Sequence, residues 1–229
     1  MADQPAHVNH LGQPIGPSLD WTAALTPPRE PLQGRYCRLE PLEPHHARHL
    51  WDAARRDVEH RNWTYRMHGP YATVDEYAEW VDSARITRDP LFFAILAPQP
   101  AGVAAYLRIA PEAGSIEVGH INLSPLLQQT AAATEAMYLM MARAFDLGYR
   151  RYEWKCDALN APSRRAAERL GFAFEGIFRQ AIVYKGRNRD SAWYSIIDQE
   201  WPARRAAFER WIAPENFDAH GRQRSQLGR

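Results

Sequence analysis

The spacing of apolar residues changes several times along the chain, and each change predicts a switch between strand and helix. Alternating or continuous apolar runs predict strands over residues 35–42, 91–96, 103–109, 115–123, 151–157, 172–184 and 191–197. Apolar residues three and four positions apart predict helices that begin at Pro44, after Thr73, and over 131–147, 160–170 and 202–212. The predicted order is therefore β-α-α-β-β-β-α-β-α-β-β, followed by one more helix.

The links between the predicted strands indicate how these strands pair. Short turns at 98–102 and 111–114 favour antiparallel neighbours. A strand–helix–strand unit spans 115–157, which implies one parallel crossover. The fold class that we predict is α/β: a mixed, mostly antiparallel sheet with one parallel crossover and helices on both faces.

The chain divides into three predicted parts. Residues 1–33 contain six prolines and no sustained periodicity, which predicts an irregular N-terminal arm. Residues 34–200 hold the predicted sheet and form one domain, and residues 201–229 form a C-terminal helix and tail. A length of 229 residues suits a single core.

Composition narrows the class of protein. The chain is 45% hydrophobic and 24% charged, the balance of a folded globular protein, and its net charge of +1 gives no support for a nucleic-acid or membrane-surface binder. No apolar run is long enough to span a membrane, and no secretory start is visible, so we expect a cytoplasmic protein. Two cysteines without a C-x-x-C pair predict neither a disulfide framework nor a metal site.

Basic residues gather in one stretch of this nearly neutral chain. From 160 to 189 there are seven basic residues against two acids. Such an excess suits an anionic ligand such as a nucleotide phosphate, but a solvated helix face and loop would give the same count. The charge alone favours the solvated face.

The junction from Leu123 to Glu135 passes from a strand into a long helix within a few residues. Helix starts carry unpaired N–H groups and a partial positive charge, which bind phosphate well. The small side chains of Ala131, Ala132 and Ala133 would let a ligand approach the backbone. A plain loop before an alanine-rich helix is the simpler interpretation of this stretch alone.

A second motif follows about 27 residues later. Asn160 is a good N-cap, and Pro162 suits the first turn of the helix that ends at Gly171. Together with the loop Gln128-x-x-Ala131-x-Ala133 and the sequence Ala133-Thr-Glu-Ala, the motif Asn160-x-x-Ser163…Gly-Phe resembles the GNAT superfamily of acyl-CoA-dependent N-acyltransferases. The resemblance covers roughly residues 35–200 and is greatest to the RimJ/RimL-like branch.

The resemblance implies an acetyl-CoA-dependent N-acetyltransferase, without a metal, that moves an acetyl group to a primary amine by direct attack on the thioester. The amine would be a peptide N-terminus or a small molecule, and a homodimer is left open. The residues implied to contact CoA are Leu123, Gln128, Gln129, Thr130, Ala131, Ala132, Ala133 and Asn160. Family loops usually carry glycine where this loop has alanine, so a catalytically weak or inactive acyl-CoA-binding module is the alternative.

Catalysis requires a base, because the amine must be neutral to attack. In the implied fold the strand 115–123 borders the thioester, and alternation places Glu117 and Gly119 on one face and His120 on the other. Glu117 is the favoured base, since burial would raise its pKa, and His120 is the rival. An ion pair with an arginine is the structural alternative for Glu117. The resemblance assigns Ser163 as the acid that protonates the departing thiolate.

Two further segments are candidates for the acceptor side. Strand 151–157 places Arg151, Glu153, Lys155 and Asp157 on one face, which predicts a wet cleft or ion pairs, and Asp157 is among the residues expected to reach the acceptor. The segment 61–68 precedes the second helix, and its Trp63 and Tyr65 could enclose an amine or belong to the core.

Overall fold

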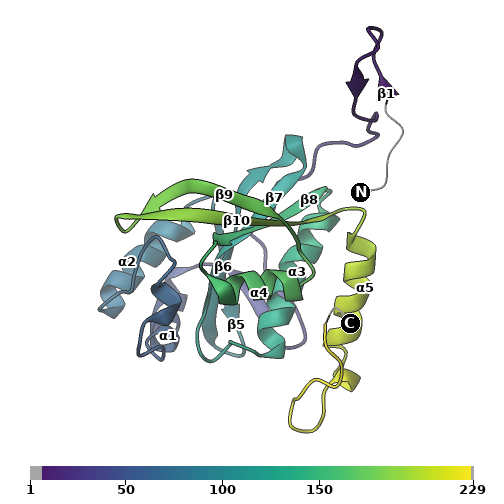
Figure 1. Cartoon of the computed structure of the whole chain (residues 1–229). Coiled ribbons are helices and arrows are strands. Elements are labelled where there is room, and N and C mark those ends of the chain that lie inside the picture. The colour runs from purple at the N-terminus through teal and green to yellow at the C-terminus, as the bar shows by residue number, and fades with distance from the viewer. Residues whose placement is uncertain (1–6, 228–229) are drawn as a thin grey trace.

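The computed structural model describes residues 7–227, which form one eight-stranded sheet with helices on both faces and a small separate hairpin (Figure 1). Residues 1–6 and 228–229 lie outside the described residues. The sheet order is β3-β4-β5-β6-β7-β8-β10-β9, in which only β7 and β8 are parallel. The strands of this sheet are β3 (Leu32–Gln33), β4 (Arg38–Pro41), β5 (Leu91–Leu96), β6 (Pro100–Ala110), β7 (Ser115–Leu123), β8 (Arg151–Asp157), β9 (Ala173–Tyr184) and β10 (Arg187–Ile197).

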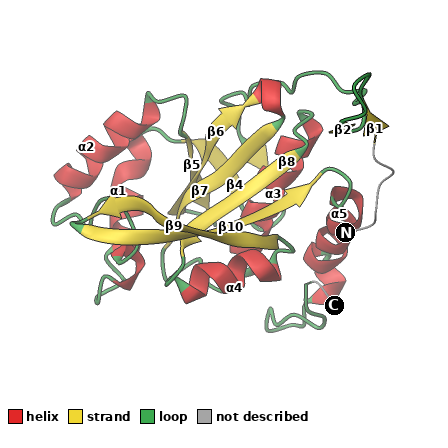
Figure 2. Cartoon of the chain, turned by 45° about the horizontal axis from the view of Figure 1, so that its top comes forward, coloured by secondary structure: helices red, strands yellow, loops and turns green. Residues whose placement is uncertain are grey.

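Helices cover both faces of the sheet, as the secondary-structure view shows (Figure 2). Their bounds are α1 (Ala47–Ala54), α2 (Val74–Arg85), α3 (Ala131–Asp146), α4 (Ala161–Arg169) and α5 (Trp201–Ile212). α1 and α2 pack on one face around buried residues such as Leu50, Val81 and Phe92. α3, α4 and α5 contribute to the larger core on the other face, around residues such as Met140 and Phe208. The predicted fold class and the parallel crossover are therefore confirmed.

The predicted helix starts are formed as local chemistry requires. Thr73 accepts a hydrogen bond from the Glu76 amide at 3.2 Å, and Asn160 accepts one from the Ser163 amide at 3.2 Å. The predicted helix after Pro44 begins with a 3-10 turn over Pro44–His46 before α1. These starts fix where the chain enters α1, α2 and α4.

The strand expected over 35–42 is shorter, because its first residues form a turn. Glu135 of α3 is 1% exposed, and its carboxylate accepts hydrogen bonds from the amides of Arg35, Tyr36 and Cys37 at 2.6–2.9 Å. Those amides are therefore unavailable to a neighbouring strand, and β4 begins only at Arg38. The acidic residue of the Ala-Thr-Glu-Ala sequence thus joins α3 to the β3–β4 turn.

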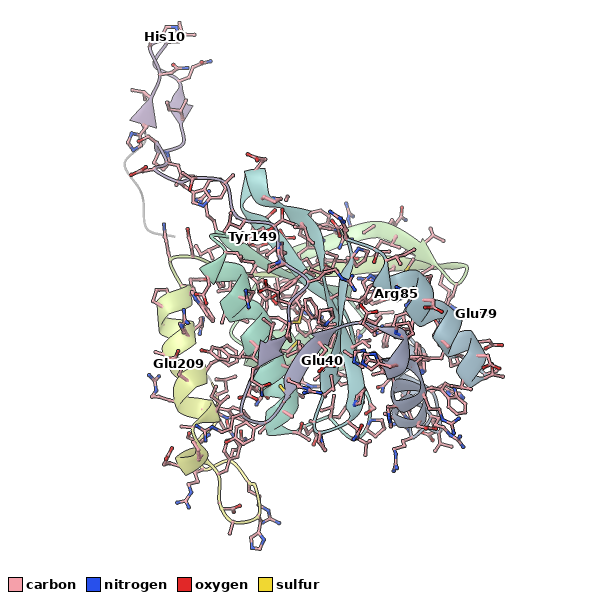
Figure 3. All side chains as sticks on the ribbon, turned by 180° about the vertical axis from the view of Figure 1, so that it is seen from behind. His10, Glu40, Glu79, Arg85, Tyr149 and Glu209 are labelled. Atoms are coloured by element: carbon pink, nitrogen blue, oxygen red, sulfur yellow. The ribbon has the colours of Figure 1, made fainter. Side chains whose placement is uncertain are left out.

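The N-terminal arm differs from the irregular segment expected over 1–33. β1 (His7–Val8) and β2 (Pro14–Ile15) form a hairpin that projects from the body of the molecule, with His10 at its far end (Figure 3). β3 at the end of the arm already pairs with β4. The proposed part boundaries at 33/34 and 200/201 stay predictions. Within residues 7–227, no helix is both long and apolar enough to cross a membrane.

Candidate active site

A cleft of about 520 Å³ lies where β7 and β8 stop pairing. The two strands are in register only from Ser115–Val118 against Arg151–Trp154, and beyond that point the cleft takes the place of a strand–strand contact. Its lining comes from the end of β6, from β7 and β8, from the start of α4, from the segment 62–68 and from the hairpin β9–β10. β7, the strand that the resemblance places beside the thioester, therefore borders an open cleft.

Glu117 lines this cleft and is 3% exposed. Its Oε2 accepts from the Arg108 guanidinium at 2.7 Å and from Lys155 Nζ at 2.9 Å. Within residues 7–227 its Oε1 accepts no hydrogen bond, and it lies 3.3 Å from where a Cβ on Gly119 would stand. Burial raises the pKa of Glu117, and the two cations oppose that rise without cancelling it.

The charged face of β8 both forms ion pairs and lines the cleft, the two alternatives that the sequence left open. Lys155 Nζ contacts Glu153 Oε2 at 2.6 Å, and Arg151 Nε contacts Glu153 Oε1 at 2.6 Å, so ion pairs are present. Lys155 and Asp157 also line the cleft, whereas Glu153 does not. Lys155 additionally lies 3.8 Å from the centre of the Trp193 ring, which shields its charge from water.

The prediction that His120 faces away from Glu117 is wrong. A β-bulge interrupts the β6–β7 register between Val103 and Ala105, and His120 adopts a φ of 49°. The bulge breaks the simple alternation, so Glu117, Gly119 and His120 all line the same cleft. Burial lowers the pKa of His120 to about 4, which keeps its ring neutral at pH 7.

The helix start expected to hold phosphate begins at Thr130, which caps α3 by accepting from the Ala133 amide at 3.2 Å. The Thr130 amide itself donates to the Leu127 carbonyl at 3.2 Å. The amides of Thr130 and Ala133, two of the residues implied to contact CoA, are thus already used within the chain. Among the described residues, the amides of Ala131 and Ala132 have no acceptor.

The missing glycines of this loop cause no backbone strain at the positions where the family usually carries them. Ala131 and Ala133 are both within α3, and alanine adopts helical geometry readily. The left-handed residue of the loop is Gln129, with a φ of 61°. The absence of glycine therefore does not distort the backbone of the helix start.

Gln128 and Leu123 are brought together, but by contacts within the chain. The Leu123 carbonyl accepts from Gln128 Nε2 and from Asn62 Nδ2, both at 3.0 Å. Gln128 Nε2 is also 2.9 Å from Asn62 Oδ1. A three-residue cluster therefore joins the end of β7, the loop before α3 and the segment that precedes α2.

Ser163 lies in the first turn of α4 and lines the cleft together with Asn160. Its hydroxyl oxygen accepts from Trp154 Nε1 at 3.0 Å. That bond uses one lone pair of the Ser163 oxygen, and the hydroxyl hydrogen is shared between the neighbouring Cys156 thiol and any group in the cleft. This arrangement is suited to donating a proton to a leaving group there.

The three candidate acceptor residues have different positions. Tyr65 lines the cleft and donates to the Leu159 carbonyl at 3.2 Å. Asp157 also lines it, but its two oxygens accept from the Leu159 amide and the Tyr184 hydroxyl at 2.8 and 2.9 Å. Trp63 is 4% exposed and belongs to the core beneath α1 and α2, so the structure does not bring its ring to the cleft.

Sequence reasoning missed several residues that line the cleft. They are Asn62, Arg66, Arg108, Phe178, Arg189 and Trp193. The short turn at 111–114 was a usable signal for Arg108, since it places the end of β6 beside Glu117 on β7. Asn62 and Arg66 lie in the candidate segment 61–68 and Arg189 lies in the basic stretch 160–189, whereas no feature of the sequence marked Phe178 or Trp193.

The sequence model of the acetyltransferase (GNAT) domain matches residues 37–173. The chain belongs to the GNAT family and is an acetyltransferase, and enzymes of this family take the acetyl group from acetyl-CoA. No curated protein sequence matches the chain.

Solved structures agree with this assignment. A GCN5-related N-acetyltransferase from Brucella melitensis is 49% identical, with a TM-score of 0.89 over 91% of this chain and 96% of that one. A probable GNAT-family acetyltransferase from Chromobacterium violaceum is 37% identical, with a TM-score of 0.76 over 83% and 99%. RimJ of Mycobacterium smegmatis, in complex with CoA-disulfide, is 20% identical, with a TM-score of 0.65 over 76% and 90%, and shows the fold alone.

Proposed function

We propose that this acetyltransferase transfers the acetyl group of acetyl-CoA to a primary amine by direct attack on the thioester. The acceptor is a peptide N-terminus or a small molecule, as in the RimJ/RimL-like branch. The observation that carries the proposal is Glu117, a buried carboxylate with one uncommitted oxygen in the opening between β7 and β8. A cytoplasmic location and a homodimer stay predictions from the sequence.

The cosubstrate is held at two places in this proposal. Its pyrophosphate lies at the start of α3, where the amides of Ala131 and Ala132 are without acceptors and the helix dipole favours negative charge. Its thioester end reaches the opening beside β7 and β8. Gln128, Gln129 and Asn160 border this path, and Leu123 ends the strand along it.

Glu117 is the proposed general base. Its Oε1 receives the ammonium proton, directly or through a water molecule, while Arg108 and Lys155 hold Oε2 and fix the carboxylate in one orientation. Gly119 keeps the space beside Oε1 open, because a side chain there would press on Leu107 at 2.8 Å and on Glu117 at 3.3 Å. The raised pKa of Glu117 makes its carboxylate a stronger base than an exposed one.

Ser163 is the proposed acid for the departing thiolate. A thiol has an ordinary pKa of about 8.5, so the thiolate leaves with modest help. Ser163 supplies a hydroxyl hydrogen whose oxygen is already fixed by Trp154. Tyr65 and Asp157 border the acceptor end of the cleft.

The test is release of free CoA thiol from acetyl-CoA in the presence of a panel of amines. The panel contains short peptides with different N-terminal residues and small primary amines, each with its N-acetylated form as the control. We expect thiol release that depends on a free amine and yields an N-acetylated product. Tight acetyl-CoA binding without turnover on any amine would favour a non-catalytic acyl-CoA-binding module instead.

A further inference from the structure

The end of β7 loses its strand neighbour on the side of β8, yet its carbonyls are not left to water. Beyond Val118 no residue of β8 pairs with β7. The carbonyls of His120, Ile121 and Leu123 accept instead from side chains of the segment 62–66. That segment therefore takes the place of a strand along the open end of β7.

Arg66 makes two of these contacts. Its Nη1 donates to the Ile121 carbonyl at 2.7 Å, and its Nη2 donates to the His120 carbonyl at 3.1 Å. These two carbonyls belong to the bulged residues, of which His120 has a left-handed conformation. One guanidinium thus spans the bulge with both terminal nitrogens, which a single-point cation such as lysine reproduces poorly.

The Arg66 side chain has no other strong partner to explain its burial. Within residues 7–227 it forms no ion pair with a carboxylate, and its buried Nε has no hydrogen-bond partner. The guanidinium lies 5.4 Å from the centre of the Trp63 ring, and burial lowers the pKa of Arg66 to about 10. The cost of burying this charge is offset chiefly by the two carbonyls of the bulge.

Asn62 extends the same contact to the loop before α3. Its Nδ2 donates to the Leu123 carbonyl at 3.0 Å, and its Oδ1 accepts from Gln128 at 2.9 Å. The segment 62–66 consequently touches both the bulge of β7 and the loop that leads to the amides of Ala131 and Ala132. A displacement of this segment would disturb both ends of the proposed acetyl-CoA path.

We propose that Arg66 and Asn62 are positioning residues for acetyl transfer: they hold the bulged end of β7 in the geometry that presents its backbone and Glu117 to the thioester. The inference rests on the proposed function and assigns these two residues a role in it. Residues 119–121 of the bulge line the cleft, and backbone N–H groups that are fixed in place before the reaction stabilise developing negative charge without reorganisation. Arg66 acts through the bulge and not on the reacting atoms.

The decisive variant is Arg66→Met, which keeps an unbranched apolar side chain and removes both donors. We expect kcat per correctly folded molecule to fall about 10- to 100-fold, the cost of a small misplacement, with a smaller change in the KM for acetyl-CoA. Arg66→Lys should recover part of the loss, and Asn62→Leu should show a weaker effect of the same kind. Arg61→Gln is the matched control, because Arg61 directly precedes the segment 62–66, is exposed and pairs with Glu59.

Hydrogen–deuterium exchange of residues 119–123 supplies a readout that does not depend on the acceptor. We expect faster exchange there in Arg66→Met than in wild type and in Arg61→Gln. Unchanged exchange would overturn the clamp itself, whether or not an acceptor is known. Faster exchange with an unchanged kcat would overturn the positioning role. If wild type acetylates no amine, the proposed function fails, while the exchange experiment still decides whether Arg66 holds the bulge.

Discussion

β7 and β8 each carry one carboxylate at the same register position, Glu117 opposite Glu153, and the surroundings of the two differ. Lys155 contacts both. Around Glu153, Arg151 and Lys155 occupy both oxygens, and although burial would raise its pKa, these hydrogen bonds outweigh burial and hold the pKa below the ordinary value. Around Glu117 one oxygen is uncommitted and burial dominates, so its pKa is raised.

The difference shows that the same cation serves two purposes on one face of the sheet. At Glu153 both carboxylate oxygens contact cations. One of these cations, Arg151, also binds Glu175, so the pair joins β8 to β9. At Glu117 the cations fix one oxygen and leave the other to the cleft. We infer that Glu153 contributes stability and that Glu117 contributes catalysis.

The largest expected effect comes from Glu117→Gln, which keeps the shape and removes the proton acceptor. We expect kcat/KM to fall roughly 10²–10⁴-fold near neutral pH, with acetyl-CoA binding retained. Raising the pH should recover part of the rate, because more of the amine is then neutral before it binds. The pH–rate profile and the melting temperature, measured on one preparation, test this.

Glu153→Gln is the matched control for that prediction. It removes a neighbouring carboxylate bound to the same lysine, so we expect a lower melting temperature with little change in turnover per folded molecule. A stable Glu117→Gln variant with wild-type turnover would remove Glu117 from the mechanism. His120, which lines the same cleft and has a neutral ring, would then be the candidate for the general base.

The next effect concerns the other end of acetyl-CoA. Ala131→Asp adds bulk and a negative charge at the start of α3, and we expect CoA affinity to fall about tenfold or more. Ala131→Gly is the control, since it opens the approach to the backbone and should preserve or improve binding. Calorimetric titration with CoA measures both, and an unchanged affinity in Ala131→Asp would show that the pyrophosphate binds elsewhere.

A smaller effect is expected for Ser163→Ala. The variant removes the proposed acid and leaves Trp154 Nε1 without its acceptor, but a thiolate is a good leaving group. We expect kcat to fall about tenfold or less. The loss should be smallest at low pH, because the departing thiolate then gains a proton from solvent more readily. A rate equal to wild type across the pH range would assign Ser163 a structural role alone.

The smallest expected effects are on the melting temperature, whose pH dependence distinguishes Glu153 from Glu117. The pKa of Glu153 is lower in the folded chain than its ordinary value of 4.5, so its stabilisation is present above that pH and is lost as the pH falls below it. The pKa of Glu117 is raised on folding, so its ionisation weakens the fold as the pH rises above 4.5. Melting temperatures of Glu153→Gln and Glu117→Gln, each relative to wild type, should therefore change with pH in opposite directions. Parallel curves would contradict the comparison.

The sequence predicted most of the fold because strand periodicity, short turns and helix caps act locally. Thr73 and Asn160 cap the predicted helices, and the crossover from β7 through α3 to β8 has the predicted parallel direction. The bulge at His120 was not predictable by alternation, because it depends on the β6 register. That single irregularity moved His120 to the same side as Glu117.

The site was predicted only in part, because local signals reveal single residues but not their partners from distant parts of the chain. Glu117 stood out as a carboxylate in an apolar strand, and an arginine partner was among the alternatives, but Lys155 as a second partner depends on pairing with β8. The sequence left open whether Trp63 encloses the amine or belongs to the core, and it packs in the core beside α1 and α2. Asn62 and Arg66 bind backbone carbonyls far along the chain, which no local pattern reveals.

The most direct test of the central claim is a crystal structure of the protein with acetyl-CoA or an unreactive thioether analogue bound. We expect the pyrophosphate to bind the amides of Ala131 and Ala132, and the acyl end to lie between β7 and β8 beside Glu117 Oε1. A ligand whose acyl end lies away from that opening, with Glu117 out of reach of any acceptor path, would contradict it.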